Sequence, residues 1–231
     1  MQLLTYSDLK TKLQNDCDIV DEDFISETEL LGYINEAISA AETAIHNLHH
    51  EDKYFLTNAT FNWVNGTSDY ALPTDIYANK IRKIWYSNGS QNYEIVRIKD
   101  LTEVNYFQAG DVYQYLLVNA AGTGPRARFF PTVAETSTNA SIWYIREMVR
   151  MTTSALATNI CEVYECQNFV FAYVRHAVAV KSRNAALIAE TKEDKVIQYN
   201  LMMETLKEMV PDENNQIPMD LTHYRFIYNW R

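Results

Sequence analysis

The stretch SETELLGYINEAISAAETAIHNLHH, residues 26–50, decides the architecture of this chain. Ser26 and Glu29 form a capping-box pattern, and Ile25 and Leu30 have the spacing of a hydrophobic staple, so a helix is predicted to begin here. Its apolar residues fall on one stripe at helical spacing, namely Leu30, Leu31, Ile34, Ala37, Ile38, Ala41, Ile45 and Leu48. Because such a helix must bury its stripe, the sequence predicts that other helices pack against it.

Helical periodicity also occurs near both ends of the chain. A shorter helix is predicted to start near Thr5 to Ser7 and to carry Leu9 and Leu13 inward, before an acidic loop over 16–23. From Cys161 a second helical region begins, with apolar positions at Cys166, Phe169, Val170, Tyr173, Val174, Ala177 and Val180. After a turn at 182–184, a helix over 185–210 carries Ile188, Val196, Ile197, Leu201 and Met209 and stops at Pro211. Two long helices joined by a short turn predict an antiparallel hairpin that packs on the N-terminal pair.

The residues between these helical regions have the pattern of β-strands. Phe61 to Val64 alternates, and Asn88-Gly89 is typical of a two-residue hairpin turn joining strands over 81–86 and 93–98. Further strands are predicted over 113–118, 126–130 and 141–148. Short strands at this spacing favour a small antiparallel sandwich or barrel with an aromatic-rich core.

The predicted fold class is therefore α+β: a helical bundle of N-terminal helices and a C-terminal helical hairpin, with an inserted antiparallel β-sandwich or barrel-like domain. The expected parts are residues 1–53 and 151–210 for the bundle, 54–150 for the β domain, and 211–231 for an extended C-terminal docking tail.

Charge and composition exclude several classes of protein. The chain has 231 residues and a formal net charge of −10, which leaves no basic excess for phosphate-driven nucleic-acid binding. No apolar run approaches the roughly 18 to 20 residues of a membrane helix, and no secretion signal is recognised at the start. Residues 1–52 hold 12 acidic and 2 basic residues, so the acidic excess is local to the N-terminal region. The three cysteines match no CxxC pattern and are expected to be free thiols, with Cys166 in the core.

A search for catalytic motifs finds little. His46, His49 and His50, with Glu42 one turn earlier, have metal-like helical spacing, but the ligands would sit at a fraying helix end, so a solvated helix C-terminus is the preferred interpretation. A metal-dependent hydrolase using this cluster stays open as an alternative function. No GxSxG motif, which would indicate a hydrolase nucleophile, is present. Residues 122–125 are interpreted as a turn rather than as a phosphate-binding loop. We therefore expect no catalytic residue, no resident metal and no cofactor.

Two features suit a protein that works by contacts. One is the acidic helix region, with Glu29, Glu36 and Glu42 along its length. The other is the tail, where a polar spacer precedes apolar residues that need a cover, either their own domain or a partner. The candidate docking residues of the tail are Ile217, Leu221, Tyr224, Phe226, Tyr228 and Trp230.

Five motifs, in this order along the chain, resemble a known family. They are Ile34-Asn35-Glu36-Ala37-Ile38, the stretch DYALPTDI over 69–76, the KIRKIWY strand over 80–86, Phe129-Phe130-Pro131, and Trp143-Tyr144-Ile145-Arg146 before the helical hairpin. The chain is similar in these respects to the head-to-tail adaptors of tailed bacteriophages, whose short-tailed relatives are called tail tubular protein A. The resemblance covers most of the chain.

The resemblance implies a structural virion protein rather than an enzyme. It implies an oligomeric ring, commonly a dodecamer, that links the portal to the tail or to the next ring or nozzle protein while genome DNA passes through its lumen. The C-terminal tail would then anchor to the portal. The acidic face of Glu29, Glu36 and Glu42 is a candidate wall of the lumen, because like charge does not hold passing DNA. The implied location is the head–tail junction, after assembly in the host cytoplasm; a non-viral interaction domain is the other alternative.

Overall fold

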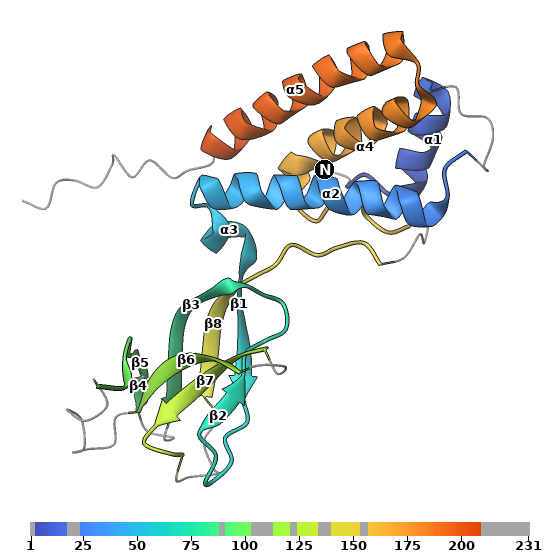
Figure 1. Cartoon of the computed structure of the whole chain (residues 1–231). Helices are drawn as coiled ribbons and strands as arrows, with labels where there is room; N and C mark the ends of the chain where they lie inside the picture. Colours follow the sequence, from blue (N-terminus) through green and yellow to red (C-terminus); the bar gives the residue numbers. More distant parts are fainter. Residues whose placement is uncertain are drawn as a thin grey trace, which may run out of the picture. The chain divides into compact units, whose positions relative to one another are not determined.

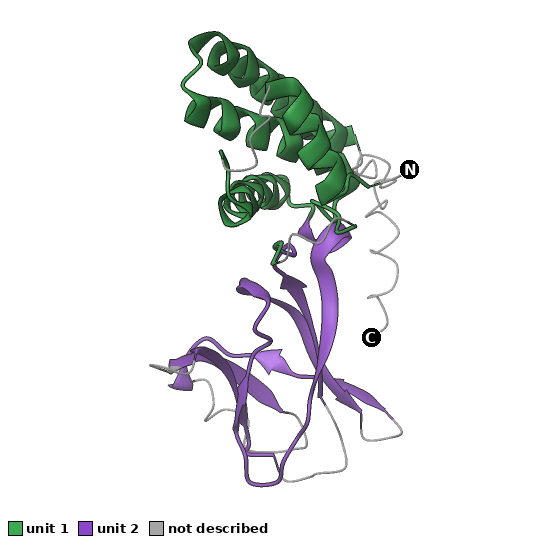
Figure 2. Ribbon diagram, turned by 90° about the vertical axis from the view of Figure 1, so that its right-hand side faces the viewer, with its two compact units in different colours: residues 1–50, 150–231 green, residues 51–149 purple. Residues whose placement is uncertain are grey.

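A computed structural model describes residues 3–17, 24–87, 91–102, 113–120, 124–133, 140–152 and 157–208. The chain divides into two compact units, which Figure 2 colours separately. The helical unit comprises residues 1–50 and 150–231, and the β unit comprises residues 51–149. The predicted α+β class is confirmed: helices at both ends of the chain share one unit, and the strands form the other.

The helical unit is built from α1 (Tyr6–Cys17), α2 (Glu27–Asn47), α4 (Gln167–Ser182) and α5 (Ala185–Glu208). A short 3₁₀ turn, η2 (Tyr164–Cys166), precedes α4. Helix α4 packs against α1, α2 and α5, so it is the central helix of the unit (Figure 1). None of the described helices is long and apolar enough to cross a membrane.

The N-terminal helices follow the predicted pattern. In α2, the Ser26 hydroxyl accepts a hydrogen bond from the Glu29 N–H at 3.2 Å, which satisfies one otherwise unpaired donor of the first turn. Most of the predicted stripe is buried, while Leu31 and Leu48 are half-buried. In α1, Leu9 and Leu13 are buried as predicted. The apolar periodicity of the sequence was therefore sufficient to predict these two helices and the faces that they bury.

The C-terminal hairpin forms as predicted, but its buried faces differ from the prediction. Asn184 caps α5 by accepting from the backbone N–H groups of Ala186 and Leu187. In α4, Val178 and Ala179 are buried, whereas Val180 is 49% exposed. In α5 the buried residues are Thr191, Met202 and Leu206. The prediction that Val196, Ile197 and Leu201 of α5 point into the core is wrong, because each is about half exposed.

The β unit begins with α3 (Glu51–Phe55) and contains two four-stranded sheets. One sheet has the order β1-β8-β3-β4, with β1 (Leu56–Phe61), β8 (Ala140–Arg146), β3 (Ile76–Ser87) and β4 (Asn92–Glu94). The other has the order β2-β7-β6-β5, with β2 (Asp69–Ala71), β7 (Gly124–Phe130), β6 (Gln114–Ala120) and β5 (Val96–Arg97). All pairs are antiparallel except β5 with β6.

The strand pairings correct three details of the prediction. The alternating stretch at Phe61 lies at the end of β1 rather than forming a strand to Val64. Ser87 pairs with Asn92, so the connection is longer than the two-residue turn expected at Asn88-Gly89, which itself lies outside the described residues. The strand expected over 93–98 is divided: β4 pairs with β3, whereas β5 pairs in the other sheet. Buried Ile95 lies between them, where the chain passes from one sheet to the other.

The core of the β unit is aromatic, as the composition predicted. Phe129 of β7 contacts the rings of Phe61, Trp63, Tyr70 and Tyr115, with centroid separations of 5.5–6.3 Å. These residues come from both sheets or the loop that joins them, so their contacts hold the two layers together.

Candidate interaction site of the helical unit

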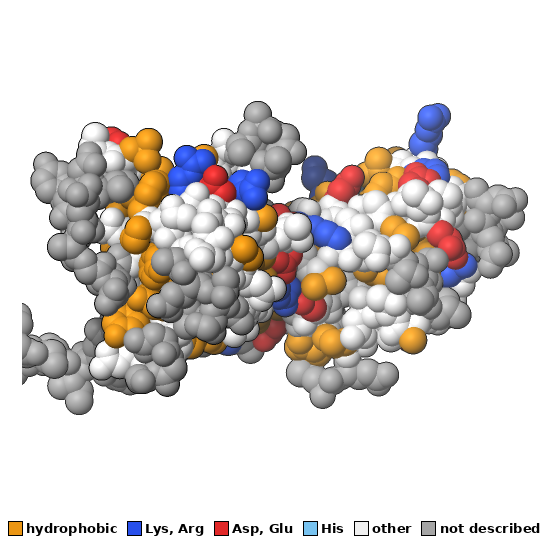
Figure 3. All heavy atoms as spheres, turned by 90° about the horizontal axis from the view of Figure 1, so that it is seen from below, with side chains coloured by type: hydrophobic (Ala, Val, Ile, Leu, Met, Phe, Trp, Pro, Cys, Tyr) orange, Lys and Arg blue, Asp and Glu red, His pale blue; other side chains and the backbone are white. Residues whose placement is uncertain are grey.

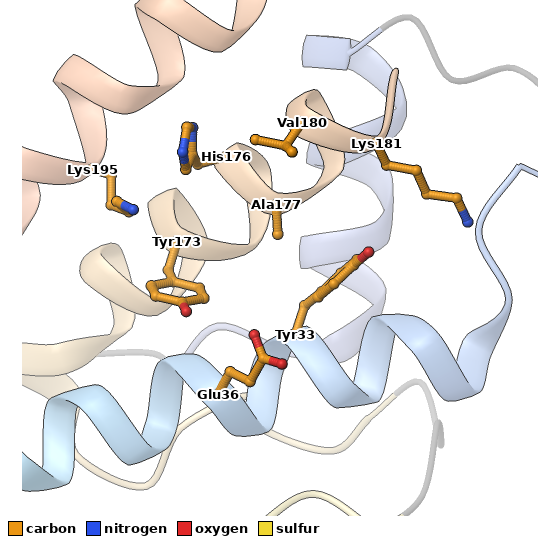
Figure 4. Close-up of a pocket in the computed structure, with 8 residues that line it drawn as sticks. All are labelled: Tyr33, Glu36, Tyr173, His176, Ala177, Val180, Lys181 and Lys195. Atoms are coloured by element: carbon orange, nitrogen blue, oxygen red, sulfur yellow. The ribbon is translucent and has the colours of Figure 1, made fainter. Parts of the chain in front are cut away.

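A hollow of about 410 Å³ lies among three helices of the helical unit. Tyr33 and Glu36 reach it from α2, and Lys195 reaches it from α5 (Figure 4). The remaining lining residues, His176, Tyr173, Ala177, Val180 and Lys181, come from α4. Residues three or four positions apart share a helix face, which places Tyr33 beside Glu36 and Tyr173 beside Ala177. The small Ala177 side chain lies between the larger groups and contributes little bulk to the space.

Two of the three basic residues of the hollow, Lys181 and His176, are paired or neutral. Lys181 pairs with Glu29, which also accepts a hydrogen bond from the Tyr33 hydroxyl at 2.8 Å. The hydrogen bond from Lys181, followed by that from Tyr33, lowers the pKa of Glu29. His176 Nδ1 lies 3.1 Å from the Thr191 hydroxyl. Burial, and then the positive charge of Lys195 and Lys192, lowers the pKa of His176, so its ring is neutral at neutral pH.

The remaining charged groups are Glu36 and Lys195. Glu36 is exposed and forms no ion pair with any residue that the structure describes. Its negative charge, after burial, contributes to raising the pKa of Tyr173. The Lys195 ammonium lies 5.2 Å from the centroid of the Tyr173 ring. The hollow therefore presents one carboxylate beside two tyrosine rings, with a lysine at one side.

The three glutamates of the predicted acidic face have different surroundings. Glu29 is half-buried and paired with Lys181, whereas Glu36 is exposed at the hollow. Glu42 is 4% exposed, and Arg150 donates a hydrogen bond to its carboxylate. Glu42 therefore contributes no exposed negative charge to this unit. Sequence spacing could not reveal this, because the partner residue lies more than a hundred positions away.

The histidine cluster is divided by the end of α2. His46 lies in the last turn and is buried, which corrects the expectation of a solvated position for it. His49 follows with a left-handed backbone, at φ 57°, and its side chain is exposed. Within the described parts of the chain, no group of three or more His, Cys, Asp or Glu side chains is placed to hold a metal ion. Cys161 and Cys166 are buried free thiols, and the hydrogen bond that the Cys166 thiol donates to Cys161, followed by burial, raises the pKa of Cys166.

Several basic residues of β3 and β7 pair with acidic residues of the same unit. Lys80 and Arg82 of β3 bind Glu51 of α3 at 3.0 and 3.2 Å, and Arg128 binds Asp69 through two hydrogen bonds at 2.7 and 2.8 Å. On the face seen in Figure 3, acidic side chains lie beside basic ones. The helical unit holds 20 acidic and 11 basic residues, a formal charge of −9, and the β unit holds 10 and 9, a charge of −1.

A second surface feature is the outward side of α5. Val196, Ile197 and Leu201 are exposed there, at 51%, 47% and 49%. Three half-exposed aliphatic side chains within two turns of one helix are suited to a contact with another protein. The predicted docking residues of the tail, Ile217 to Trp230, lie outside the described residues. The sequence does show three apolar residues close together at Val196, Ile197 and Leu201. Helical periodicity alone, however, assigned them to the core rather than to the surface.

Comparison with known proteins yields one family match. The model of the family described as SU10 adaptor protein matches residues 4–216. A comparison with curated proteins finds no match. The family match spans both compact units, from α1 through the β unit to the end of α5 and beyond.

Proposed function

This chain belongs to the SU10 adaptor protein family, a family of phage head–tail adaptors, and on that premise we propose that it forms an oligomeric ring at the head–tail junction of a virion. The observation that carries the proposal is the extent of the match, which includes the helices, the inserted β unit and the hairpin. Membership places the protein among phage structural adaptors, which are generally not enzymes.

The ring is proposed to close through a heterologous interface repeated around an axis. Such an interface needs two different, complementary surfaces on each subunit. The exposed aliphatic side chains of α5 supply one apolar surface of the kind that such an interface buries. A dodecamer is the copy number that we propose.

The partners in this proposal are the portal protein on one side and a tail protein, or the next ring or nozzle protein, on the other. Residues Ile217, Leu221, Tyr224, Phe226, Tyr228 and Trp230 are proposed to anchor the ring to the portal. Large apolar and aromatic anchors after a polar spacer suit capture of a neighbouring protein.

Passage of genome DNA through the lumen is the third part of the proposal. A wall with net negative charge repels the phosphate backbone and does not retain it. The helical unit, at −9, is the better candidate for such a wall than the β unit, at −1. Of the predicted acidic face, Glu36 is exposed, Glu29 is half-buried and paired with Lys181, and Glu42 is buried, so the wall is proposed on the net charge of the unit rather than on these three side chains.

Sedimentation velocity of the full chain, alone and mixed with the portal protein of the same virion, tests the proposal. We expect a complex whose mass corresponds to a ring of this chain on the portal. Deletion of residues 217–231 should abolish portal binding and leave the two units folded. Full-strength portal binding by the truncated chain would exclude the anchoring role, and the absence of any ring in the mixture would exclude the adaptor proposal itself.

A further inference from the structure

We propose that the hollow among α2, α4 and α5 binds an arginine side chain of a neighbouring protein, with the guanidinium against Glu36 and between the rings of Tyr33 and Tyr173. The identity of the neighbour as another virion protein rests on the proposed function. The chemistry of the site does not, because it follows from the lining residues alone.

The geometry favours one long, thin side chain. Figure 4 shows the Glu36 carboxylate between the two tyrosine rings, one from α2 and the other from α4. Ala177 contributes only a methyl group, and the space of about 410 Å³ is open at the surface. A side chain that binds here can contact an aromatic ring and the exposed carboxylate at the same time.

The Glu36 carboxylate favours a cation at its end of the hollow, because no described residue forms an ion pair with it. Lys181 is neutralised by Glu29, and the His176 ring is neutral at neutral pH, so neither offers a free positive charge to a phosphate. Lys195 lies over the Tyr173 ring, away from the exposed Glu36 carboxylate. The formal charge of −9 on the helical unit adds a long-range attraction for a basic partner.

The pair of rings favours arginine over lysine. A guanidinium group is planar, stacks on aromatic rings and forms two parallel hydrogen bonds with one carboxylate. An ammonium group is more strongly hydrated and offers no flat face to a ring. Lys195 beside Tyr173 is also placed to donate to a peptide carbonyl of the incoming segment.

The test is an NMR titration of the full chain with N-acetyl-arginine amide and with its uncharged citrulline analogue. Ring signals of Tyr33 and Tyr173 are assigned with the Tyr33→Phe and Tyr173→Phe variants. We expect saturable shifts of both signals with the arginine compound, and binding that is about ten-fold or more weaker for citrulline, because the charge-assisted hydrogen bonds to Glu36 are lost.

Two pairs of variants make the test specific. Glu36→Gln should weaken arginine binding about ten-fold or more, whereas Glu193→Gln, an exposed glutamate of α5, should leave it unchanged. Ala177→Leu should fill the hollow and block binding, whereas Ala186→Leu, at an exposed position of α5, should not. Circular dichroism checks that each variant is folded.

Several results would overturn the inference: no saturable shift with the arginine compound, equal binding of citrulline, or wild-type affinity in Glu36→Gln. Shifts of the same tyrosine signals by inorganic phosphate in place of arginine would show an anion site and overturn it as well. The assay uses this chain alone, so it is separate from the ring test. Arginine binding by a chain that forms no ring with portal would keep the site and reject the adaptor proposal.

Discussion

Arg150 donates a hydrogen bond through Nη2 to the carboxylate of Glu42, whose side chain is only 5% exposed. The pair joins α2 to the residue at which the chain re-enters the helical unit. Because Asn35 also binds the backbone of Met151, through hydrogen bonds of 2.8 and 3.0 Å, this segment is fixed to α2 at two points.

Replacement of Arg150 should therefore destabilise the helical unit. Arg150→Met leaves a buried carboxylate without its cation, and we expect the free energy of unfolding to fall by about 3 kcal/mol. Urea unfolding followed by far-ultraviolet circular dichroism measures the loss. The double variant Arg150→Met, Glu42→Gln should recover part of it, because no buried charge remains. Equal stability of Arg150→Met and wild type would contradict this role.

The N-cap of α2 gives a prediction with a control in the same helix. Ser26→Ala removes the hydroxyl that accepts from Glu29 N–H, and we expect a loss of about 1 kcal/mol. Ser39→Ala removes a hydroxyl that donates to the Asn35 carbonyl inside the helix, where alanine has the higher helix propensity. Thermal unfolding of both variants should show a lower Tm for Ser26→Ala only.

Tyr144 should make the β unit sensitive to alkaline pH. Burial, and then its 2.8 Å hydrogen bond to Asp75, raises the pKa of Tyr144 from 10.0 to about 12. The folded state thus holds this proton more tightly than the unfolded state. The resulting stability is fully present below pH 10 and is lost as the pH rises toward 12.

Tryptophan fluorescence measures this effect, since Trp63, Trp85 and Trp143 all lie in the β unit. Urea unfolding of wild type should show a falling midpoint between pH 10 and 12, and Tyr144→Phe should show a smaller fall over the same range. Parallel pH profiles of the two proteins would be inconsistent with a raised Tyr144 pKa.

The two sides of α5 should respond differently to substitution. The double variant Ile197→Ser, Leu201→Ser changes exposed side chains, and we expect its unfolding free energy to stay within about 0.5 kcal/mol of wild type. Leu206→Ala, at a fully buried position, should lose about 2 to 5 kcal/mol. Urea unfolding compares them. A loss of similar size in the double variant would show that Ile197 and Leu201 pack within the subunit.

Much of the fold was predictable from residue spacing. The stripe of α2, the Ser26 cap and the turn at Asn184 are local signals, so they placed the helices within a few residues. The division of 93–98 between two sheets was not predictable, because alternation does not reveal which strand is the neighbour. The interaction site was only partly predictable: Glu36 was identified as part of the acidic region and Tyr173 was assigned to the apolar stripe of its helix, whereas Tyr33 and Lys195 gave no signal.

The sequence by itself determined where the helices and strands form and that their apolar sides must be covered, because these properties depend on residues a few positions apart. Only the tertiary structure decided which charges are used internally and which remain exposed. Glu42 and Glu36 lie on the same helix, yet Arg150 reaches one carboxylate and no described cation reaches the other. That difference arises because a residue far away in the chain is brought next to one carboxylate and not the other, and the packing of the helical unit decides which.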